Sequence, residues 1–334
     1  MDTFVSVIIP VRNEEKHISE CIDSITSQTY PKENLEVLLI DGRSEDNTRK
    51  IIEKYSRSYS YIKVLDNPRK IVPTALNIGI KASKGDVIIR MDAHTYYDKN
   101  YISKCIETLK NIDAYNVGGP IVTLPGDSTL KAKAIALATS HPFGVGNSKF
   151  RTSQKAQYVD TVAFGAFKRE IFDKIGLFNE NLPRNQDIEF NSRIRKFGGK
   201  IFLNPEIKSY YHNQSTLKGL WKQNFKNGMW NIFTHVISGN PLSIRHYIPF
   251  VFVISLIMSI FLALIHPAGI FLFSLIAVSY LGANAISTFK IGFNHGLKVI
   301  PLLPIVFFTL HFSYGLGSLF GIFRLRQWEK KIKN

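Results

Sequence analysis

The first part of the chain alternates short apolar runs with segments whose apolar residues recur at helical spacing. Apolar runs rich in β-branched residues predict strands, and spacing of three and four residues predicts helices. The predicted strands cover residues 4–11, 35–40, 61–65, 87–91 and 114–123. The predicted helices begin near residue 15 and cover 47–55, 74–82, 101–110, 169–175 and 185–196. Strands that alternate with helices predict an α/β fold with a doubly wound, mostly parallel sheet.

This pattern is interrupted between residues 141 and 157, where Gly and Pro are frequent and no acidic residue occurs. A loop of this length inside a compact domain is usually functional, and many such loops are lids. We therefore predict a mobile lid with two glycine hinges and two cations that can contact an anion. The candidate lid residues are Phe143, Gly144, Gly146, Lys149 and Arg151.

The last third of the chain is apolar and basic. Residues 215–237 interleave aromatic side chains with lysines, which predicts an interfacial amphipathic helix, with a break at Gly228 as one option. Residues 247–265, 268–289 and 299–323 then contain no charged side chain. Each of these three segments meets the length of about 20 residues that a bilayer crossing needs.

The distribution of charge points to a membrane surface. The chain carries a net charge of +16, and from residue 190 onward 16 Lys and Arg face two acidic residues, which places +14 in that part. Basic residues beside apolar segments fit a cytoplasmic membrane surface better than nucleic acid.

The basic residues also constrain the topology. They stand before the first apolar segment, between the second and third, and after the third. The positive-inside rule places all of them in the cytoplasm, which three full crossings do not allow. Either the rule fails, or the third segment is re-entrant or interfacial; we expect a cytoplasmic C-terminus. Residues that permit a break in this segment are Pro301, Pro304, Gly315 and Gly317.

Two potential metal ligands follow the strand predicted over residues 87–91. Asp92 and His94 stand at its carboxyl end, where open α/β sheets place their ligands. A carboxylate and an imidazole there can hold a divalent cation against a diphosphate. The alternative is a strand followed by a polar turn that caps the next element.

Several motifs, in order along residues 4–212, resemble those of inverting family 2 glycosyltransferases with the GT-A fold. Residues 7–14, Val-Ile-Ile-Pro-Val-Arg-Asn-Glu, resemble the opening strand and nucleotide-contacting loop of that family. Residues 41–48 resemble its Asp-Asp-Gly-Ser-x-Asp-x-Thr segment, whose acidic end contacts the uracil and ribose. Residues 75–79 resemble its Ala-Arg-Asn-x-Gly helix, although Leu76 replaces the arginine.

Two further motifs extend the resemblance. Asp92-Ala93-His94 stands at the Asp-x-Asp site of the family, and Asn185-Gln186-Asp187 stands where the family usually has Asn-Glu-Asp. Gln186 is therefore a departure that spares the acid at position 187. The Asp-Ala-His variant and the Phe-Gly-Val-Gly-Asn loop are most similar to membrane-bound exopolysaccharide enzymes of the succinoglycan type.

The resemblance implies transfer of a sugar from a nucleotide-diphosphate sugar, expected to be a UDP-sugar, to a hydroxyl of a lipid-linked or polysaccharide acceptor with inversion. Mn²⁺ or Mg²⁺ at Asp92 and His94 would neutralise the diphosphate, and the imidazole favours Mn²⁺. His212 is a candidate third ligand or phosphate contact, or else a structural histidine. Asp187 is the expected general base; its alternative role is to stabilise a helix dipole. The candidate donor-binding residues are Pro10, Arg12, Asn13, Glu14, Asp41, Asn77 and Asp92, and Gln186 is expected beside the acceptor.

The expected organisation has four parts. Residues 1–212 form the GT-A catalytic domain, 213–245 an interfacial helix region, 246–324 a transmembrane region and 325–334 a basic tail. We expect a multi-pass cell-membrane protein with its catalytic domain on the cytoplasmic side. Its expected partners are the donor, a polyprenyl-linked glycan acceptor and membrane lipids, without nucleic acid.

Two other function classes remain open. One is a different nucleotide-binding enzyme on a membrane anchor, such as a nucleotidyltransferase, although no Gly-x-Gly-x-x-Gly follows the first strand. The other is a non-enzymatic membrane transporter or scaffold, although the apolar segments carry none of the charged residues that usually mark a transport path.

Overall fold

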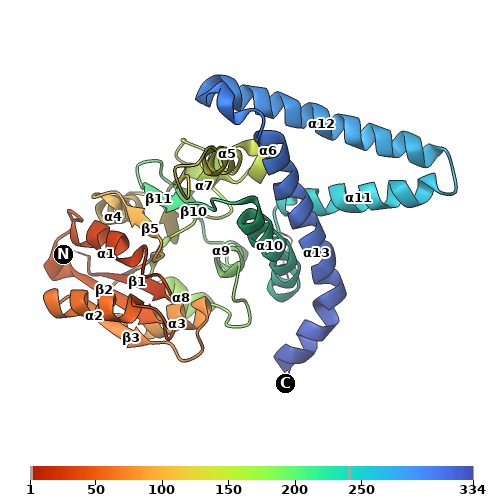
Figure 1. The fold of residues 1–334 in the computed structure, drawn as a ribbon. Helices are drawn as coiled ribbons and strands as arrows, with labels where there is room; N and C mark the ends of the chain where they lie inside the picture. Colours follow the sequence, from red (N-terminus) through yellow and green to blue (C-terminus); the bar gives the residue numbers. More distant parts are fainter. Residues whose placement is uncertain (1–2, 240–241, 334) are drawn as a thin grey trace. The chain divides into compact units, whose positions relative to one another are not determined.

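The computed structural model describes residues 3–239 and 242–333, and Figure 1 shows their fold. The chain divides into two compact units, which are described separately. Unit 1 comprises Met1–Val122 and Ser153–Tyr211, and unit 2 comprises Thr123–Thr152 and His212–Asn334. The segment Thr123–Thr152, which the sequence placed within the catalytic part, thus belongs with the C-terminal helices.

Unit 1 is built on an eight-stranded sheet with the order β3-β2-β1-β4-β9-β6-β10-β8. The first four strands in this order run parallel, and β9 is antiparallel to both β4 and β6. The strands are β1 (Val5–Val11), β2 (Leu35–Asp41), β3 (Ile62–Asp66), β4 (Val87–Arg90), β6 (Asn116–Gly118), β8 (Gln157–Tyr158), β9 (Ala166–Lys168) and β10 (Ile201–Leu203). A smaller sheet has the order β5-β11-β7, with β5 (Thr95–Tyr97), β7 (Ile121–Leu124) and β11 (Ser209–His212).

The central strands are nearly continuous apolar runs because helices cover the sheet, and β1 and β2 are buried almost throughout. Helix α3 packs on β1 and β2, and Gly79 allows the close approach: a Cβ there would lie 2.5 Å from Cγ2 of Ile8. The helices of this unit are α1 (Ile18–Thr26), α2 (Thr48–Ser58), α3 (Val72–Ala82), α4 (Tyr101–Asn111), α8 (Glu170–Ile175) and α9 (Gln186–Lys196). The strand register pairs Val11 with Asp41 and Ile8 with Arg90, so the carboxyl ends of β1, β2 and β4 meet at one edge.

One predicted strand is wrong. The run 114–123 forms two strands, β6 and β7, which belong to different sheets. Gly119 and Pro120 lie between them. A Cβ on Gly119 would clash with the carbonyl oxygen of Ile207, and Pro120 has no N–H for a sheet ladder.

Unit 2 is helical. Its buried apolar core brings α5, α10, α12 and α13 together through residues such as Ile135, Leu220, Ile291 and Phe307. The helices are α5 (Leu130–Ala138), α6 (Pro142–Val145), α7 (Lys149–Thr152), α10 (Leu217–Ser238), α11 (Ile248–Ala263), α12 (Ala268–His295) and α13 (Leu303–Lys333). Thus the segment 141–157, predicted as a loop, contains two single-turn helices.

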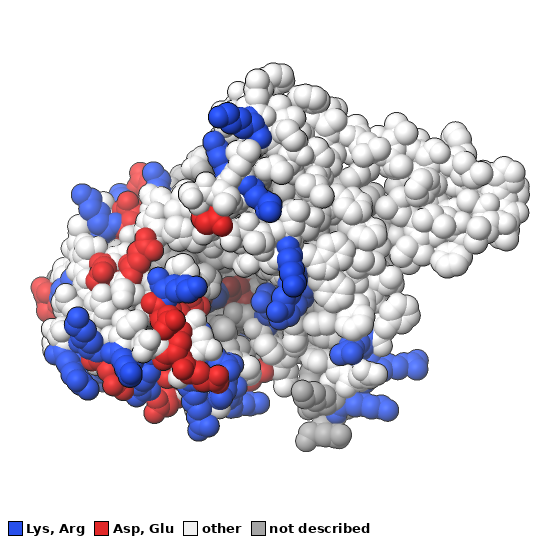
Figure 2. Space-filling view, in the orientation of Figure 1, with Lys and Arg blue, Asp and Glu red and all other residues white. Residues whose placement is uncertain are grey.

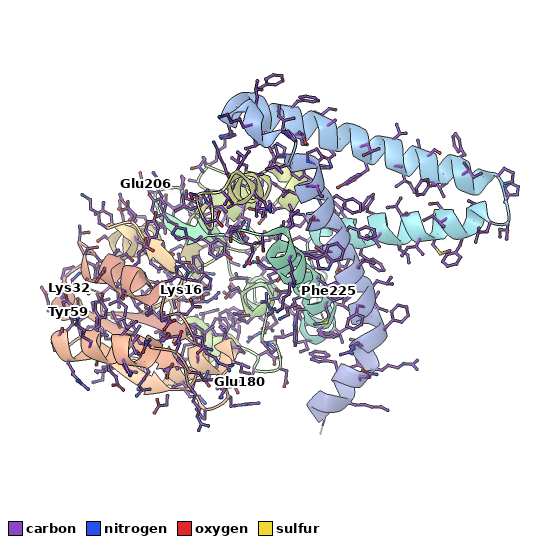
Figure 3. The ribbon with its side chains drawn as sticks, in the orientation of Figure 1. Lys16, Lys32, Tyr59, Glu180, Glu206 and Phe225 are labelled. Carbon is purple, nitrogen blue, oxygen red and sulfur yellow. The ribbon has the colours of Figure 1, made fainter. Side chains whose placement is uncertain are left out.

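Glycines allow the helices of unit 2 to pack closely and do not interrupt them. Helix α10 continues through Gly228, and α13 continues through Gly315 and Gly317, so the breaks considered there do not occur. A Cβ on Gly317 would clash with the carbonyl oxygen of Phe225, and one on Gly228 would clash with that of Tyr314. Phe225 of α10, labelled in Figure 3, also packs against Phe320 of α13, with ring centroids 5.6 Å apart and the ring planes tilted by 48°.

Two helices of the described part, rather than three, are long and apolar enough to cross a membrane. They are α12 and the stretch 303–330 of α13, whereas α11 has 16 residues. Pro301 precedes α13 and Pro304 lies in its first turn, where proline is tolerated because the N–H there has no intrahelical acceptor.

The close approach of α10 and α13 yields a stability prediction. Gly317→Val should lower the free energy of unfolding by about 1–3 kcal/mol, because the side chain has to displace the backbone of α10. Gly282→Val is the matched control, since a Cβ on this helical glycine meets no atom within 4 Å. Thermal unfolding in detergent measures both, and equal midpoints for the two variants would contradict the packing.

Candidate active site

The loop after β1 is fixed to the loop after β2 by hydrogen bonds. Asn13, in the left-handed region with φ 55°, accepts a hydrogen bond from the Glu45 amide through Oδ1 at 2.8 Å. The Asn13 amide donates to Ser44 Oγ at 3.0 Å, and the Glu14 amide donates to Thr48 Oγ1 at 2.7 Å. Two candidate donor-binding segments, predicted separately from sequence, therefore form one rigid rim.

Asp41 ends β2 at this rim. Its carboxylate is almost fully buried, accepts a hydrogen bond from Ser44 Oγ at 2.6 Å and lies 3.5 Å from Arg49 Nη1. Arg12 is more exposed, with its Nη2 3.8 Å from Glu45 Oε1. Pro10 lies within β1 opposite Ile40. Contact of these residues with a nucleotide remains a prediction.

Asn77 has a structural task in α3. Its Nδ2 donates to the carbonyl oxygen of Phe178 and to Glu180 Oε1, both at 2.9 Å. Its Oδ1 accepts from the Phe178 amide at 3.0 Å. Glu180, labelled in Figure 3, also pairs with Arg69 at 2.6 Å. Both amide hydrogens of Asn77 are therefore bonded within the protein. Asn77 thus fixes the loop that contains Phe178 and Glu180, and its contact with a donor remains a prediction.

Asp92 and His94 follow β4 at the same edge. His94 Nδ1 lies 3.1 Å from Glu14 Oε1, which leaves Nε2 as the atom that can bind a metal. Burial alone would lower the pKa of His94, but the hydrogen bond to Glu14 and the charge of Asp92 outweigh it and raise the pKa. Protons therefore compete for this ring more strongly than for a free imidazole.

A buried arginine connects Asp92 to Asp187. Arg90 is the last residue of β4, and its side chain is only 7% exposed. Its Nη2 lies 3.1 Å from Asp92 Oδ1, its Nη1 pairs with Asp187 Oδ2, and the guanidinium lies 5.8 Å from the centroid of the Phe164 ring. The structure thus brings two predicted site acids together through a residue that we did not select from sequence. A lone cation in the apolar run Val-Ile-Ile-Arg-Met was the available signal.

The two acids at the start of α9 have different surroundings. Asp187 is directed to Arg90, whereas Glu189 is almost fully buried and forms a two-pronged pair with Arg193, at 2.6 Å and 3.0 Å. Arg193 also donates to the carbonyl oxygens of Ile175 and Leu177. Glu189 therefore holds α9 in place and does not face Asp92.

Asn185 and Gln186 prepare this helix start. Asn185 adopts the left-handed conformation with φ 60° at the N-cap, which turns the chain sharply into α9. Gln186 is buried in the first turn. The contact of Gln186 with an acceptor remains a prediction.

The ligand set around Asp92 suits a cation that takes part of its coordination from a substrate. Among the residues that the structure describes, no three His, Cys, Asp or Glu side chains converge. Two protein ligands such as Asp92 and His94 are compatible with a Mg²⁺-type site, because such sites commonly use one or two protein ligands together with phosphate oxygens and water; their role as ligands remains a prediction. His212 belongs to unit 2, where its Nδ1 lies 3.3 Å from the carbonyl oxygen of Pro125; its role as a third ligand remains a prediction.

The candidate lid residues belong to unit 2 as well. Phe143 is packed against Phe307 and His311, each with ring centroids 4.9 Å away, and its carbonyl oxygen lies 2.7 Å from His311 Nε2. Gly146 has φ 62°, a conformation that glycine adopts without strain, and its role as a hinge remains a prediction. Gly144 serves close packing, because a Cβ there would clash with the carbonyl oxygen of Ala138.

The cationic end of this segment carries Lys149 and Arg151, both within α7. Arg151 Nη1 lies 3.5 Å from Thr123 Oγ1, and the guanidinium carbon lies 5.6 Å from the centroid of the neighbouring Phe150 ring. Their contact with an anion remains a prediction.

Comparison with known proteins places these motifs in a family. The family described as Glycosyl transferase family 2 matches residues 6–176. A dolichyl N-acetyl-alpha-D-glucosaminyl phosphate 3-beta-D-2,3-diacetamido-2,3-dideoxy-beta-D-glucuronosyltransferase from Methanococcus voltae is 30% identical over 96% of this chain and 98% of its own. The succinoglycan biosynthesis protein ExoA of Rhizobium meliloti is 30% identical over 66% of this chain and 67% of its own.

Solved structures agree on the fold. The mannosyltransferase PcManGT from Pyrobaculum calidifontis, in complex with GDP-Man and Mn²⁺, has a TM-score of 0.62 at 17% identity, over 96% of this chain and 88% of its own. S. aureus TarS 1-349 in complex with UDP-GlcNAc has a TM-score of 0.52 at 15% identity, over 97% of this chain and 91% of its own. These likenesses confirm the predicted GT-A-like α/β fold with a mostly parallel sheet.

Proposed function

Because this chain belongs to glycosyl transferase family 2, we propose that it transfers a sugar from a UDP-sugar to a hydroxyl of a polyprenyl-linked glycan, with inversion. The chain is a glycosyltransferase, as the sequence predicted. The observation that carries the finer proposal is the meeting of Asp92 and Asp187 on one guanidinium group. Such a meeting supplies a cation site and a proton acceptor side by side.

Asp92 and His94 are the residues that would hold Mn²⁺ or Mg²⁺. A bound divalent cation neutralises the charge that develops on the departing diphosphate. The imidazole nitrogen favours Mn²⁺ over Mg²⁺, and the PcManGT structure was solved with Mn²⁺. Glu14 orients the His94 ring through Nδ1, which presents Nε2 to the ligand.

Asp187 is the proposed base. Its Oδ1 is buried and has no hydrogen-bond partner among the described residues, so it can accept the proton of an acceptor hydroxyl. The hydroxyl oxygen then bonds to the anomeric carbon as the bond between that carbon and the diphosphate oxygen breaks, and the nucleotide diphosphate leaves. Attack opposite the leaving group inverts the configuration at the anomeric carbon.

The names of relatives support the donor and acceptor classes. TarS was solved with UDP-GlcNAc and PcManGT with GDP-Man, so nucleotide sugars bind this fold. UDP is our choice because residues 41–48 resemble the family's uracil-contacting segment. The Methanococcus relative is named for a dolichyl phosphate-linked sugar and matches 96% of the chain, and ExoA is named for succinoglycan biosynthesis. An acceptor carried by a polyprenyl lipid in cell-surface glycan synthesis fits both names.

The apolar helices of unit 2 support membrane association. Helix α12 and much of α13 have the length and composition of membrane spans. A lipid-linked acceptor requires the enzyme to work at the bilayer, and the basic C-terminal part fits the cytoplasmic face. We place the catalytic unit on that side, and we assign Lys149 and Arg151 to contact with the diphosphate or acceptor.

A transfer assay in detergent tests this function. We expect sugar transfer from a UDP-sugar to a polyprenyl-linked acceptor when Mn²⁺ or Mg²⁺ is present, with loss of product in excess chelator. Asp92→Asn should lower turnover by at least about 100-fold, because it removes a ligand that acts on the leaving group. Asp113→Asn is the control, since this acid is exposed and pairs with Lys200. Full activity in excess chelator would rule out the cation.

The two acids of α9 separate the base from a structural carboxylate. Asp187→Asn should abolish transfer while donor affinity stays nearly unchanged, which marks an interaction made in the transition state. Glu189→Gln should retain turnover but lower the free energy of unfolding by roughly 3 kcal/mol, because it breaks a buried ion pair. Initial rates and thermal unfolding distinguish the two effects. A fully active Asp187→Asn enzyme together with an inactive Glu189→Gln enzyme would reverse the assignment.

A further inference from the structure

We propose that Arg90 is a positioning residue that sets the spacing between the cation-binding carboxylate and the base. This inference rests on the proposed function and adds a residue to it. It begins from an unusual placement, since Arg90 ends β4 inside the sheet and is almost fully buried. A buried charge is costly unless anions and hydrogen bonds compensate it.

The compensation comes from Asp92 and Asp187. The former contacts Nη2 and the latter Nη1, and both nitrogens are bonded to one carbon of a planar group. The two carboxylates are therefore held one guanidinium width apart. Asp187 arrives from a position 97 residues further along the chain, so this contact fixes the start of α9 against the end of β4.

The guanidinium contacts only one oxygen of each acid. It uses Oδ1 of Asp92 and Oδ2 of Asp187, and Asp187 Oδ1 has no hydrogen-bond partner among the described residues. The Nε atom of Arg90 likewise has no hydrogen-bond partner among the described residues. Thus each acid keeps one oxygen for the cation or the acceptor, while the other oxygen fixes its direction.

A lysine cannot reproduce this arrangement. Its single ammonium group is a point charge without the planar fork that holds two carboxylates at a set spacing. Arg90→Lys therefore keeps the charge and removes the spacing. The proposed role predicts a loss of turnover without a loss of cation or donor binding, which separates it from a general role in stability.

The matched control is Arg193, which lies on α9, the helix that also carries Asp187. Arg193 pairs with the buried Glu189 and donates to two carbonyl oxygens, so Arg193→Lys disturbs a partly buried arginine–acid pair that does not include Asp92. Both lysine variants should lower the unfolding midpoint. Only Arg90→Lys should also lower the turnover number.

The experiment combines turnover with binding. Arg90→Lys should lower kcat at least about 100-fold, whereas the donor KM and the Mn²⁺ affinity, read from the spectrum of free Mn²⁺, change less than about threefold. Arg193→Lys should keep kcat within about threefold. Arg90→Ala should regain part of its turnover in millimolar guanidinium, which replaces the missing group, and none in millimolar ammonium.

The outcomes are separable. A wild-type kcat in Arg90→Lys overturns the proposal, and so does a loss of Mn²⁺ or donor binding that matches the loss of turnover. If Arg90→Lys fails to fold, Arg90→Ala with and without guanidinium decides, and absence of rescue overturns the role. Activity of Asp187→Asn in the same assay would instead refute the proposed function, whatever Arg90 does.

The packing of unit 2 carries a second inference independently. We infer that only the α11–α12 hairpin enters the lipid bilayer, and that α13 remains on the side from which the hairpin enters. The hairpin is apolar and exposed, with Ile265 and Phe271 at its tip 83% and 73% accessible. Between Arg245 and Lys290 the sequence has no charged residue, and Figure 2 shows no charged side chain over this part of unit 2.

The length of the hairpin fits insertion from one side. Helix α11 has 16 residues, which is roughly 24 Å at about 1.5 Å per residue, less than the hydrocarbon thickness of about 30 Å. Helix α12 is longer, but at Asn284 it is joined to α13, since Asn284 Nδ2 donates to the carbonyl oxygen of Pro304 at 3.1 Å. The two helices join closely at the tip, where a Cβ on Gly269 would clash with Ala263.

Helix α13 has a different environment. Half of its most apolar window is buried, against 11% for α12, because α10 lies along it. Helix α10 carries Lys218, Lys222 and Lys226, and a crossing by α13 would take these lysines into the bilayer at about 2.5–3.5 kcal/mol each. With α13 outside, Arg245, Lys298 and the basic residues near the C-terminus all stay on one side, as the positive-inside rule requires.

Single cysteines test this topology, because Cys21 and Cys105 are buried. The probe is a membrane-impermeant maleimide applied to sealed vesicles of both orientations from expressing cells. Ser58→Cys on unit 1, Lys298→Cys and Arg326→Cys, all at exposed positions, should react from the same side. Ile265→Cys should react from neither side until detergent is added.

Two results would overturn this topology. Reaction of Arg326→Cys from the side opposite Ser58→Cys would show that α13 crosses the bilayer. Prompt reaction of Ile265→Cys, from either side, would show that the tip reaches water. Sugar transfer in detergent is measured separately, so failure of the topology leaves the proposed chemistry standing.

Discussion

The site depends on one buried cation. Arg90 occupies a strand that is otherwise apolar, and its charge is tolerated because Asp92 and Asp187 pair with it. The same contact joins β4 to α9, so the fold and the alignment of the site have a common cause. Removing either acid leaves a buried charge incompletely paired, which links the chemistry of this edge to the stability of the sheet.

The other polar contacts at this edge of the sheet also use only one of the two polar atoms of each side chain. Glu14 takes Nδ1 of His94 and leaves Nε2, while Arg90 takes one oxygen from each of two acids and leaves the other. Buried polar groups that are satisfied on one side have a defined direction on the other. An enzyme that must align a cation, a diphosphate and a hydroxyl gains from such preorganisation, because little reorganisation remains for the reaction itself.

Sequence pattern predicted the parallel strands because apolar runs are a local signal. It also selected Asp92 and Asp187, which the structure brings together on Arg90, although their catalytic roles remain a prediction. It could not predict Arg90, since a single cation in an apolar run gives no sign of which acids will meet it. It also gave Gly315 and Gly317 as positions that permit a break in the helix, whereas neighbouring helices approach closely at them. The divided strand at 114–123 has the same origin, because the approach of Ile207 to Gly119 is a tertiary contact.

We propose that the division of residues between the units follows the physical state of the two proposed substrates, a UDP-sugar and a polyprenyl-linked glycan. A nucleotide sugar is charged and dissolved in water, and the candidate donor residues, the base and Gln186 all belong to unit 1. A polyprenyl carrier resides in lipid, and the other candidate acceptor residues share unit 2 with the apolar helices. Phe143 joins the candidate acceptor segment to the apolar helices. Its ring packs on Phe307 of α13, and it stands a few residues before the cationic helix α7 in the sequence. The Phe143 ring also lies 5.8 Å from the ring of Tyr280 on α12, a helix that we place in the bilayer. We therefore propose that acceptor recognition and membrane binding belong to one structural unit.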